Sequence, residues 1–160
     1  MVMQKKYLTK EEALQKLRHY CAYQERSHHD VVQKLWDLGV RKSEHDEIVS
    51  PLIEDDYLNE ERFAIHFAGG HFRMKDWGRK KIYYGLKEKS VSTYNINKAL
   101  KSINEEDYLQ TLNKLAEKKY DLLKGEQYLV RKKKTTDYLL QKGYEHELVS
   151  AAVNRLAVKE

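Results

Sequence analysis

Residues 76–91 have the sequence DWGRKKIYYGLKEKSV, and this stretch decides how the rest of the chain is interpreted. Ile82 and Leu86 lie four residues apart in it, which predicts a helix over about 77–89 with one apolar face. Residues 73–89 also carry seven basic side chains against two acids. The face opposite the apolar one presents Trp77, Lys80, Tyr84 and Lys87. A face that alternates cations with flat rings suits phosphates, bases or protein surfaces.

The tight turn that closes this stretch recurs on both sides of it. The matching segments are Leu35-x-x-x-Gly39-Val40, Leu86-x-x-x-Ser90-Val91 and Leu139-x-x-x-Gly143-Tyr144. Their first leucines are separated by 51 and then 53 residues, and the apolar positions of the helix after each turn also align. Each unit therefore predicts two helices, a tight turn and a third helix. Units of about 50 residues have little core of their own, so stacked neighbours support one another.

The predicted fold is all-α: an elongated, curved array of three tandem three-helix repeats with about nine helices. The predicted boundaries are an N-terminal tail at 1–8 and repeats at 9–58, 59–104 and 105–160. We expect Pro51 to make the third helix short, late-starting or bent, because proline removes a helix hydrogen bond. The fourth helix is expected to start after an Asn59 N-cap and to end near Gly69 and Gly70.

Composition restricts the partner and the compartment. The 160 residues have a mean hydropathy of −0.84, a net charge of +5 and a pI near 9.1, which favours nucleic acid or an acidic protein surface as partner. The one cysteine, Cys21, excludes an internal disulfide, and the lack of a signal-like apolar stretch predicts a cytoplasmic protein. No segment reaches the ~18 apolar residues of a membrane helix. Nothing in the sequence demands a dimer, so we expect a monomer.

Sequence motifs for catalysis or cofactor binding are missing. The chain has no glycine-rich phosphate loop, no nucleophile elbow and no metal-ligand spacing among its seven histidines. Cys21 lies on an apolar helical stripe, where a small core residue is expected rather than a nucleophile. The acids Asp55, Asp56, Glu60 and Glu61 are interpreted as an exposed face. We therefore predict a non-enzymatic protein with no catalytic residues, no metal and no cofactor.

Two basic clusters supply the candidate binding residues. They comprise Arg73, Lys75, Trp77, Arg79, Lys80, Lys81, Tyr84 and Lys87 in the centre, and Arg131, Lys132, Lys133 and Lys134 further on. A single lysine on a helix is usually just solvated, but two clusters at equivalent places in successive repeats favour a binding surface. Gly78 and Gly85 would each cost about 1 kcal/mol inside a helix, which indicates close approach by a neighbouring helix.

Three segments, in this order, resemble the RecX family of regulators of the RecA recombinase. The segments are YLNEERFA at 57–64, WGRKKI through LKEKSV at 77–91, and YLLQKGY followed by ELV at 138–149. The resemblance extends over about 11–156, which is nearly the whole chain. Each pattern is short, and the match depends on their order and spacing across three repeats.

The resemblance implies an all-helical, elongated protein that binds along the groove of the RecA–DNA filament. It implies that the protein limits filament growth, RecA's ATP hydrolysis and strand exchange, and so regulates homologous recombination, DNA repair and the SOS response. The implied partners are the RecA filament and, without sequence preference, single-stranded DNA or the DNA backbone. Two alternatives remain open: a non-specific or helix-turn-helix-like DNA-binding protein, and a helical-repeat scaffold for an acidic protein.

Overall fold

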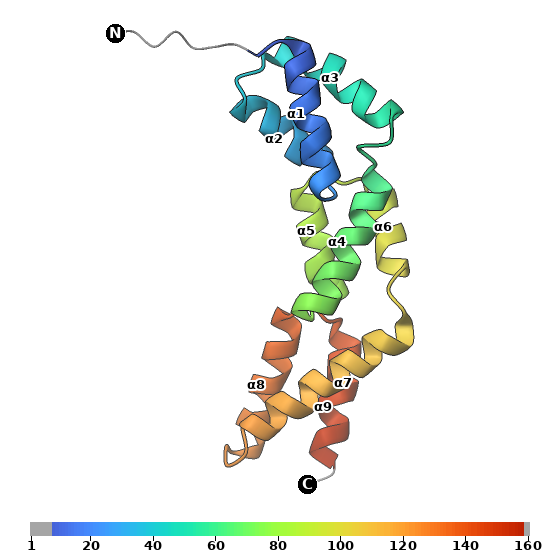
Figure 1. The fold of residues 1–160 in the computed structure, drawn as a ribbon. Coiled ribbons are helices and arrows are strands. Elements are labelled where there is room, and N and C mark those ends of the chain that lie inside the picture. The colour runs from blue at the N-terminus through green and yellow to red at the C-terminus, as the bar shows by residue number, and fades with distance from the viewer. Residues whose placement is uncertain (1–7, 159–160) are drawn as a thin grey trace, which may run out of the picture.

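The structure, a computed structural model, describes residues 8–158, which fold into nine α-helices with no strand (Figure 1). In chain order the helices are α1 (Lys10–Tyr23), α2 (His28–Asp37), α3 (Lys42–Glu54), α4 (Glu60–Lys75), α5 (Arg79–Glu88), α6 (Thr93–Lys101), α7 (Glu105–Leu122), α8 (Tyr128–Gln141) and α9 (His146–Val158). The all-α prediction is confirmed. All of the expected tail except Leu8 lies outside the described residues.

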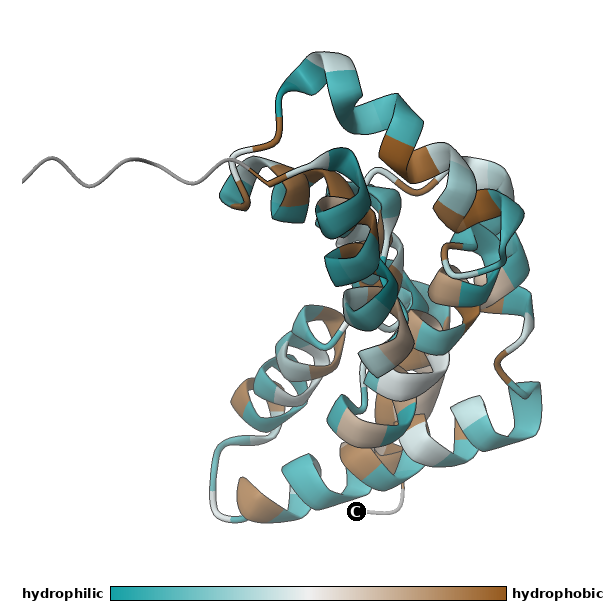
Figure 2. Cartoon of the chain, turned by 45° about the horizontal axis from the view of Figure 1, so that its top comes forward, coloured by the Kyte–Doolittle hydropathy of each residue, from teal (hydrophilic) through white to brown (hydrophobic). Residues whose placement is uncertain are grey.

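The helices pack in three successive groups, which we call repeat 1 (α1–α3), repeat 2 (α4–α6) and repeat 3 (α7–α9). In Figure 1 these groups follow one another along a long, curved body, with α2, α5 and α8 on its left side. Figure 2 shows hydrophilic residues over much of the outward helix surface. The residue at which one repeat gives way to the next stays a prediction.

Each repeat contains the same turn between its second and third helices. Gly39, Ser90 and Gly143 adopt positive φ angles of 76°, 60° and 101°. In each turn the amide of the next residue donates to the carbonyl of the shared leucine, in the pairs Val40–Leu35, Val91–Leu86 and Tyr144–Leu139. This hydrogen bond and the positive φ define a left-handed helix cap. The three matching sequence segments therefore share one turn geometry, which Ser90 adopts without being glycine.

The start of α3 and the end of α4 differ from the predictions, which were based on the positions of proline and glycine in the sequence. Helix α3 is neither short nor late: its 13 residues begin at Lys42 and include Pro51. Pro51 is near the end of α3, so most of the helix forms before the hydrogen bond that proline removes. Helix α4 continues through Gly69 and Gly70 and ends at Lys75, followed by the C-cap Asp76, whose φ is 57°. The helix persists because its neighbouring apolar side chains are buried, which outweighs the cost of glycine.

The buried apolar side chains form two separate clusters. One cluster belongs to repeat 1 and includes Leu17 and Leu35. The other is continuous across repeats 2 and 3 and includes Ile82, Leu86 and Tyr108. Repeats 2 and 3 therefore share one hydrophobic core, whereas repeat 1 has its own.

Candidate binding surface

The outer face of α5 is the exposed part of the central cluster. Ile82 and Leu86 are fully buried, as their spacing predicted. Their burial turns Lys80, Tyr84 and Lys87 outward, and the ring of Tyr84 is 66% exposed. Residues spaced by four and then three positions lie above one another on a helix. Two ammonium groups and one ring therefore form a single exposed row, which we call the α5 face.

Trp77 lies beside this row and not on it. It precedes α5, although it was expected on the same helical face as Lys80. Its half-buried ring packs against Phe67 and His71, with ring centroids 6.3 and 4.5 Å apart. The ammonium groups of Lys75 and Lys81 lie 5.6 and 4.8 Å from its ring centroid. Trp77 thus holds two cations at the base of α5 through cation–π contacts.

Both glycines of this stretch make close approaches: the neighbour of Gly85 lies on helix α4, as predicted, whereas the neighbour of Gly78 is a turn and not a helix. Gly78 is the N-cap of α5, and a Cβ there would overlap the backbone of Gly143 in repeat 3. A Cβ on Gly85 would come within 2.8 Å of the Phe67 ring. The first glycine therefore admits the turn of the next repeat, and the second admits an aromatic ring of its own repeat.

Arg79 belongs to the joint between repeats 2 and 3. Its guanidinium lies 3.9 Å from the ring centroid of Tyr108 and pairs with Glu145 at 2.7 Å and also with Glu105. Burial disfavours its charge, but hydrogen bonds and attraction from the two carboxylates outweigh that effect and raise the pKa of Arg79. Its charge is therefore neutralised within the fold.

The second basic cluster, on α8, also contains a buried member. Arg131 is only 9% exposed, its guanidinium stacks 3.5 Å from the ring centroid of Tyr120, and its Nε donates to the Tyr120 carbonyl oxygen at 2.8 Å. Lys132 is half-buried. Lys133 and Lys134 are exposed, and each forms an ion pair with a carboxylate of repeat 3, at 2.8 and 2.9 Å. Arg131 therefore holds helices together, and the three lysines make up the surface part of the cluster.

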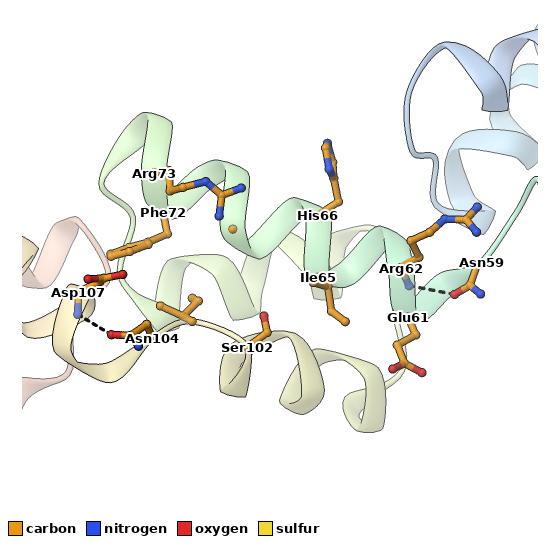
Figure 3. Close-up of a pocket in the computed structure, with 12 residues that line it drawn as sticks. Asn59, Glu61, Arg62, Ile65, His66, Phe72, Arg73, Ser102, Asn104 and Asp107 are labelled. Atoms are coloured by element: carbon orange, nitrogen blue, oxygen red, sulfur yellow. Dashed lines mark hydrogen bonds between the residues drawn. The ribbon is translucent and has the colours of Figure 1, made fainter.

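Arg73 lines a separate groove along α4 (Figure 3). The groove has a volume of about 780 Å³ and also contains the carboxylates of Glu61 and Asp107, so its charge is mixed. A Cβ on Gly69 would lie 2.7 Å from the Arg73 guanidinium, which means that this side chain lies back along α4. No residue of α5 lines this groove. Arg73 is thus placed apart from the α5 face.

Two features of the molecule escaped the sequence analysis. One is the pairing of Arg79 with Glu145, which is 66 residues away and carries no local signal. The other is a basic and aromatic cleft in repeat 1, between α1 and α2. The sequence does contain a signal for this cleft. With the 51-residue offset of the repeats, the basic Arg26 aligns with Trp77, a residue of the central basic and aromatic cluster.

Among residues 8–158, no group of three or more histidine, cysteine or acidic side chains is arranged to hold a metal ion. No helix in the same range is long and apolar enough to cross a membrane. Cys21 is 7% exposed, and burial raises the pKa of its thiol to about 11. The thiol therefore stays protonated at neutral pH, as suits a core residue.

Two family models match the chain: RecX, second three-helix domain, at residues 59–100, and RecX, third three-helix domain, at residues 105–153. A regulatory protein RecX from Clostridium perfringens (strain 13 / Type A) is 34% identical over 130 residues, which cover 79% of this chain and 60% of the relative. A regulatory protein RecX from Chlorobium limicola is 28% identical over 130 residues, 81% of this chain and 80% of the relative. The chain thus spans about 60% of the length of its clostridial relative.

The fold is also found among solved structures. The crystal structure of RecX from Lactobacillus salivarius superimposes with a TM-score of 0.84 at 23% identity, over 93% of this chain and 97% of that one. A second crystal structure, of a regulatory protein RecX, gives a TM-score of 0.83 over 91% of this chain. Because the two solved structures are only 23% and 20% identical to this chain, their similarity shows the fold alone. The family itself is shown by the two family models, which together cover more than half of the sequence. The chain belongs to the RecX family.

Proposed function

We propose that this protein binds a RecA–DNA filament and limits its assembly, and with it RecA's ATP hydrolysis and strand exchange. In this proposal the protein acts by occupying the filament as a monomer, without catalysis, in the cytoplasm. Its role is the regulation of homologous recombination and DNA repair, including the SOS response. The family supports a regulatory role, and the observation that carries the proposal is the exposed α5 face.

The α5 face suits a partner that contains nucleic acid. Lys80 and Lys87 present positive charge on either side of the exposed Tyr84 ring, and Trp77 holds Lys75 and Lys81 close by. Ammonium groups neutralise phosphates without reading sequence, and rings between them stack on bases or on protein surfaces. Any contact with DNA is therefore proposed to be electrostatic and non-specific.

The shape of the molecule favours a repeating partner. Helices α2, α5 and α8 lie along the same side of the curved body, so equivalent helices of successive repeats face one direction (Figure 1). Helix α8 also carries two exposed lysines, Lys133 and Lys134, each of which is paired with a carboxylate of repeat 3. The proposed contact set is Lys75, Lys80, Lys81, Tyr84 and Lys87, with Lys132, Lys133 and Lys134 as a second patch. Arg79 and Arg131 are assigned to the fold instead, because both are stacked on tyrosines.

The test is RecA's DNA-dependent ATPase, measured with this protein at substoichiometric amounts. We expect the parent protein to inhibit, and a variant with Lys80→Glu, Tyr84→Ala and Lys87→Glu to need about tenfold more protein for the same inhibition, because charge reversal repels phosphates. The matched control is Lys101→Glu, an exposed lysine on α6. Circular dichroism confirms that each variant keeps its helices.

The proposal is wrong if the parent protein leaves the ATPase unchanged. If the α5 variant and the parent inhibit equally, the filament contact lies elsewhere on the molecule. A salt titration separates the DNA part of the proposal, since the affinity of an electrostatic contact falls steeply as salt rises. Binding of DNA that is unchanged between low and moderate salt would remove that part.

A further inference from the structure

Repeat 1 contains an open cleft between the C-terminal half of α1 and helix α2, with a volume of about 480 Å³. We call it the repeat-1 cleft. The residues that line it include Lys16, Tyr20, Tyr23, Arg26 and Lys34. No carboxylate is among its lining residues, so three basic side chains surround two rings. We propose that the repeat-1 cleft binds single-stranded nucleic acid, with its cations on phosphates and the exposed Tyr23 ring on a base.

Two of the three cations of the cleft already contact Tyr20 in the absence of a ligand. Arg26 donates from Nε to the Tyr20 carbonyl oxygen at 3.0 Å, and its guanidinium stacks 3.7 Å from the Tyr20 ring centroid. The ammonium of Lys34 lies 5.4 Å from the same ring. A stacked guanidinium keeps hydrogen-bond donors at its edge that can still reach phosphate oxygens. Binding a backbone phosphate here therefore needs little ordering of the arginine.

The side chain of Tyr23 lines the repeat-1 cleft and is exposed to solvent. Tyr23, the last residue of α1, is 83% exposed, which is the largest exposure of any tyrosine among the exposed large hydrophobic residues of the described range. Rings of this kind, placed among cations, are the stacking platforms of proteins that bind single strands. Stacking of an unpaired base on the Tyr23 ring would therefore explain why this ring is exposed.

Repeat 2 shows that the fold does not require such a cleft. With the 51-residue offset, Lys16, Tyr20, Arg26 and Lys34 of repeat 1 align with Phe67, His71, Trp77 and Gly85 of repeat 2. In repeat 2 this position is filled by three rings that pack together, and a Cβ on Gly85 would lie 2.8 Å from the Phe67 ring and 3.4 Å from the Trp77 ring. In repeat 1 the same position is open and positively charged. The two repeats share the order of helices and the turn after the second helix, and at this position they differ in their side chains and in how the first helix ends.

The observations favour nucleic acid over an acidic peptide. Both ligands would satisfy the cations, but only bases make use of an exposed ring beside them. The carboxylate of Asp30 acts on Tyr20, but it is already paired with Lys89 at 2.7 Å and accepts a hydrogen bond from the Ser27 amide. The cleft shares no residue with the α5 face, so this inference goes beyond the proposed function and can hold or fail independently of it.

The test is the fluorescence anisotropy of a fluorescein-labelled oligothymidylate of about 15 nucleotides, a length that covers a typical single-strand site, with no recombinase present. Tyr23→Ala should weaken binding about fivefold, the effect of losing about 1 kcal/mol of base stacking. Lys16→Gln with Lys34→Gln should reduce the slope of log affinity against log salt by about 1.4, because each single-strand phosphate contact contributes about 0.7. These side chains lie at the surface or the edge of the cleft, so the variants are expected to fold.

The controls are matched in chemistry and lie outside the cleft. Tyr94→Ala removes a ring that is 68% exposed on α6, and Lys101→Gln with Lys114→Gln removes two exposed charges. The proposal is supported if only the cleft variants lose affinity, and if an abasic oligomer of equal length binds Tyr23→Ala and the parent alike. It is overturned if the control variants lose as much affinity as the cleft variants. It is also overturned if polyglutamate displaces the oligonucleotide at an equal charge concentration, which would show an acidic-peptide site.

Discussion

The two joints between the repeats are built in opposite ways, and the joint between repeats 2 and 3 is apolar and tightly packed. One cluster of buried apolar side chains runs across it. Backbone hydrogen bonds join the two repeats directly, from the Gly78 amide to the Lys142 carbonyl at 2.8 Å and from the Lys80 amide to the Gly143 carbonyl at 2.9 Å. Such contacts form only when both repeats are folded, so we expect repeats 2 and 3 to unfold together.

The joint between repeats 1 and 2 depends on charged side chains. Arg62 pairs with Glu25 at 2.5 Å and with Asp56 at 3.1 Å, and Lys89 pairs with Asp30 at 2.7 Å. All of these side chains are partly exposed, so each pair contributes about 0–1 kcal/mol and weakens as salt rises. The apolar clusters on its two sides are separate.

The difference indicates two cooperative units of unequal size. Repeats 2 and 3 make one unit through their shared core, and repeat 1 makes another that is attached by ion pairs. Each unit has its own fluorescent reporter, because Trp36 lies in repeat 1 and Trp77 in repeat 2. The same charged joint connects the repeat-1 cleft to the α5 face, so the relative position of these two surfaces should respond to ionic strength.

The largest expected effect is at the tight joint, where Gly143→Ala should destabilise repeats 2 and 3 by about 3 kcal/mol or more. The residue has a φ of 101°, and a Cβ there would overlap the backbone and side chain of Lys81. Urea unfolding followed by Trp77 fluorescence measures the loss.

The control for this change is the equivalent glycine of repeat 1. Gly39 has a φ of 76°, but nothing lies within 4 Å of a Cβ built there. Gly39→Ala should therefore cost only the backbone strain, about 1–2 kcal/mol. Equal losses for Gly39→Ala and Gly143→Ala would contradict the close packing of Gly143 against repeat 2.

Much of the fold could be predicted because its signals are local. The spacing of Ile82 and Leu86 set the buried face of α5, and the recurrence of a leucine followed by a turn residue gave three turns that share one geometry. The end of α4 was predicted wrongly at Gly69 and Gly70. Burial of the apolar residues around these glycines is a tertiary effect that a glycine signal in the sequence does not report.

The candidate binding residues could be predicted only as clusters. Arg79 and Arg131 are indistinguishable in the sequence from Lys80, because all three lie in basic runs. What separates them is a stacking tyrosine from another helix, 29 residues away for Arg79 and 11 for Arg131. Whether a cation is free depends on such distant partners, and composition carries no information about them.

A smaller effect compares one arginine at each joint. Arg79→Met should destabilise repeats 2 and 3 by about 2 kcal/mol, because it leaves the half-buried Glu145 carboxylate without its guanidinium partner and removes the stacking on the Tyr108 ring. Arg62→Met should cost less than about 1 kcal/mol, since water can replace its partly exposed pairs. Thermal unfolding in low and in 1 M salt checks both values. A larger loss for Arg62→Met than for Arg79→Met would reverse the assignment of the two joints.

The smallest effect concerns the pH dependence of the charged joint. Burial alone would raise the pKa of Asp30, but hydrogen bonds from Lys89 and Ser27 outweigh it and hold the pKa below its ordinary value of 3.8. A carboxyl with a lowered folded-state pKa stabilises the fold above pH 3.8, and that contribution is lost as the pH falls through the folded-state value. Asp30→Asn should therefore be less stable than the parent at pH 7, by about 1 kcal/mol or less, and the difference should shrink below pH 4.

Trp36 fluorescence during urea unfolding, in a Trp77→Phe background, measures this difference within repeat 1. Other carboxylates are also protonated in acid, so the informative quantity is the parent minus the Asp30→Asn variant at each pH. Asp107→Asn is a suitable control, because Asp107 is an exposed acid in the first turn of α7, in repeat 3. If the difference at Asp30 stays constant down to pH 2, its carboxylate contributes through the capping of α2 and not through the charge pair with Lys89. Of the ion pairs named at the joint between repeats 1 and 2, those of Arg62 would then carry the contribution of charge.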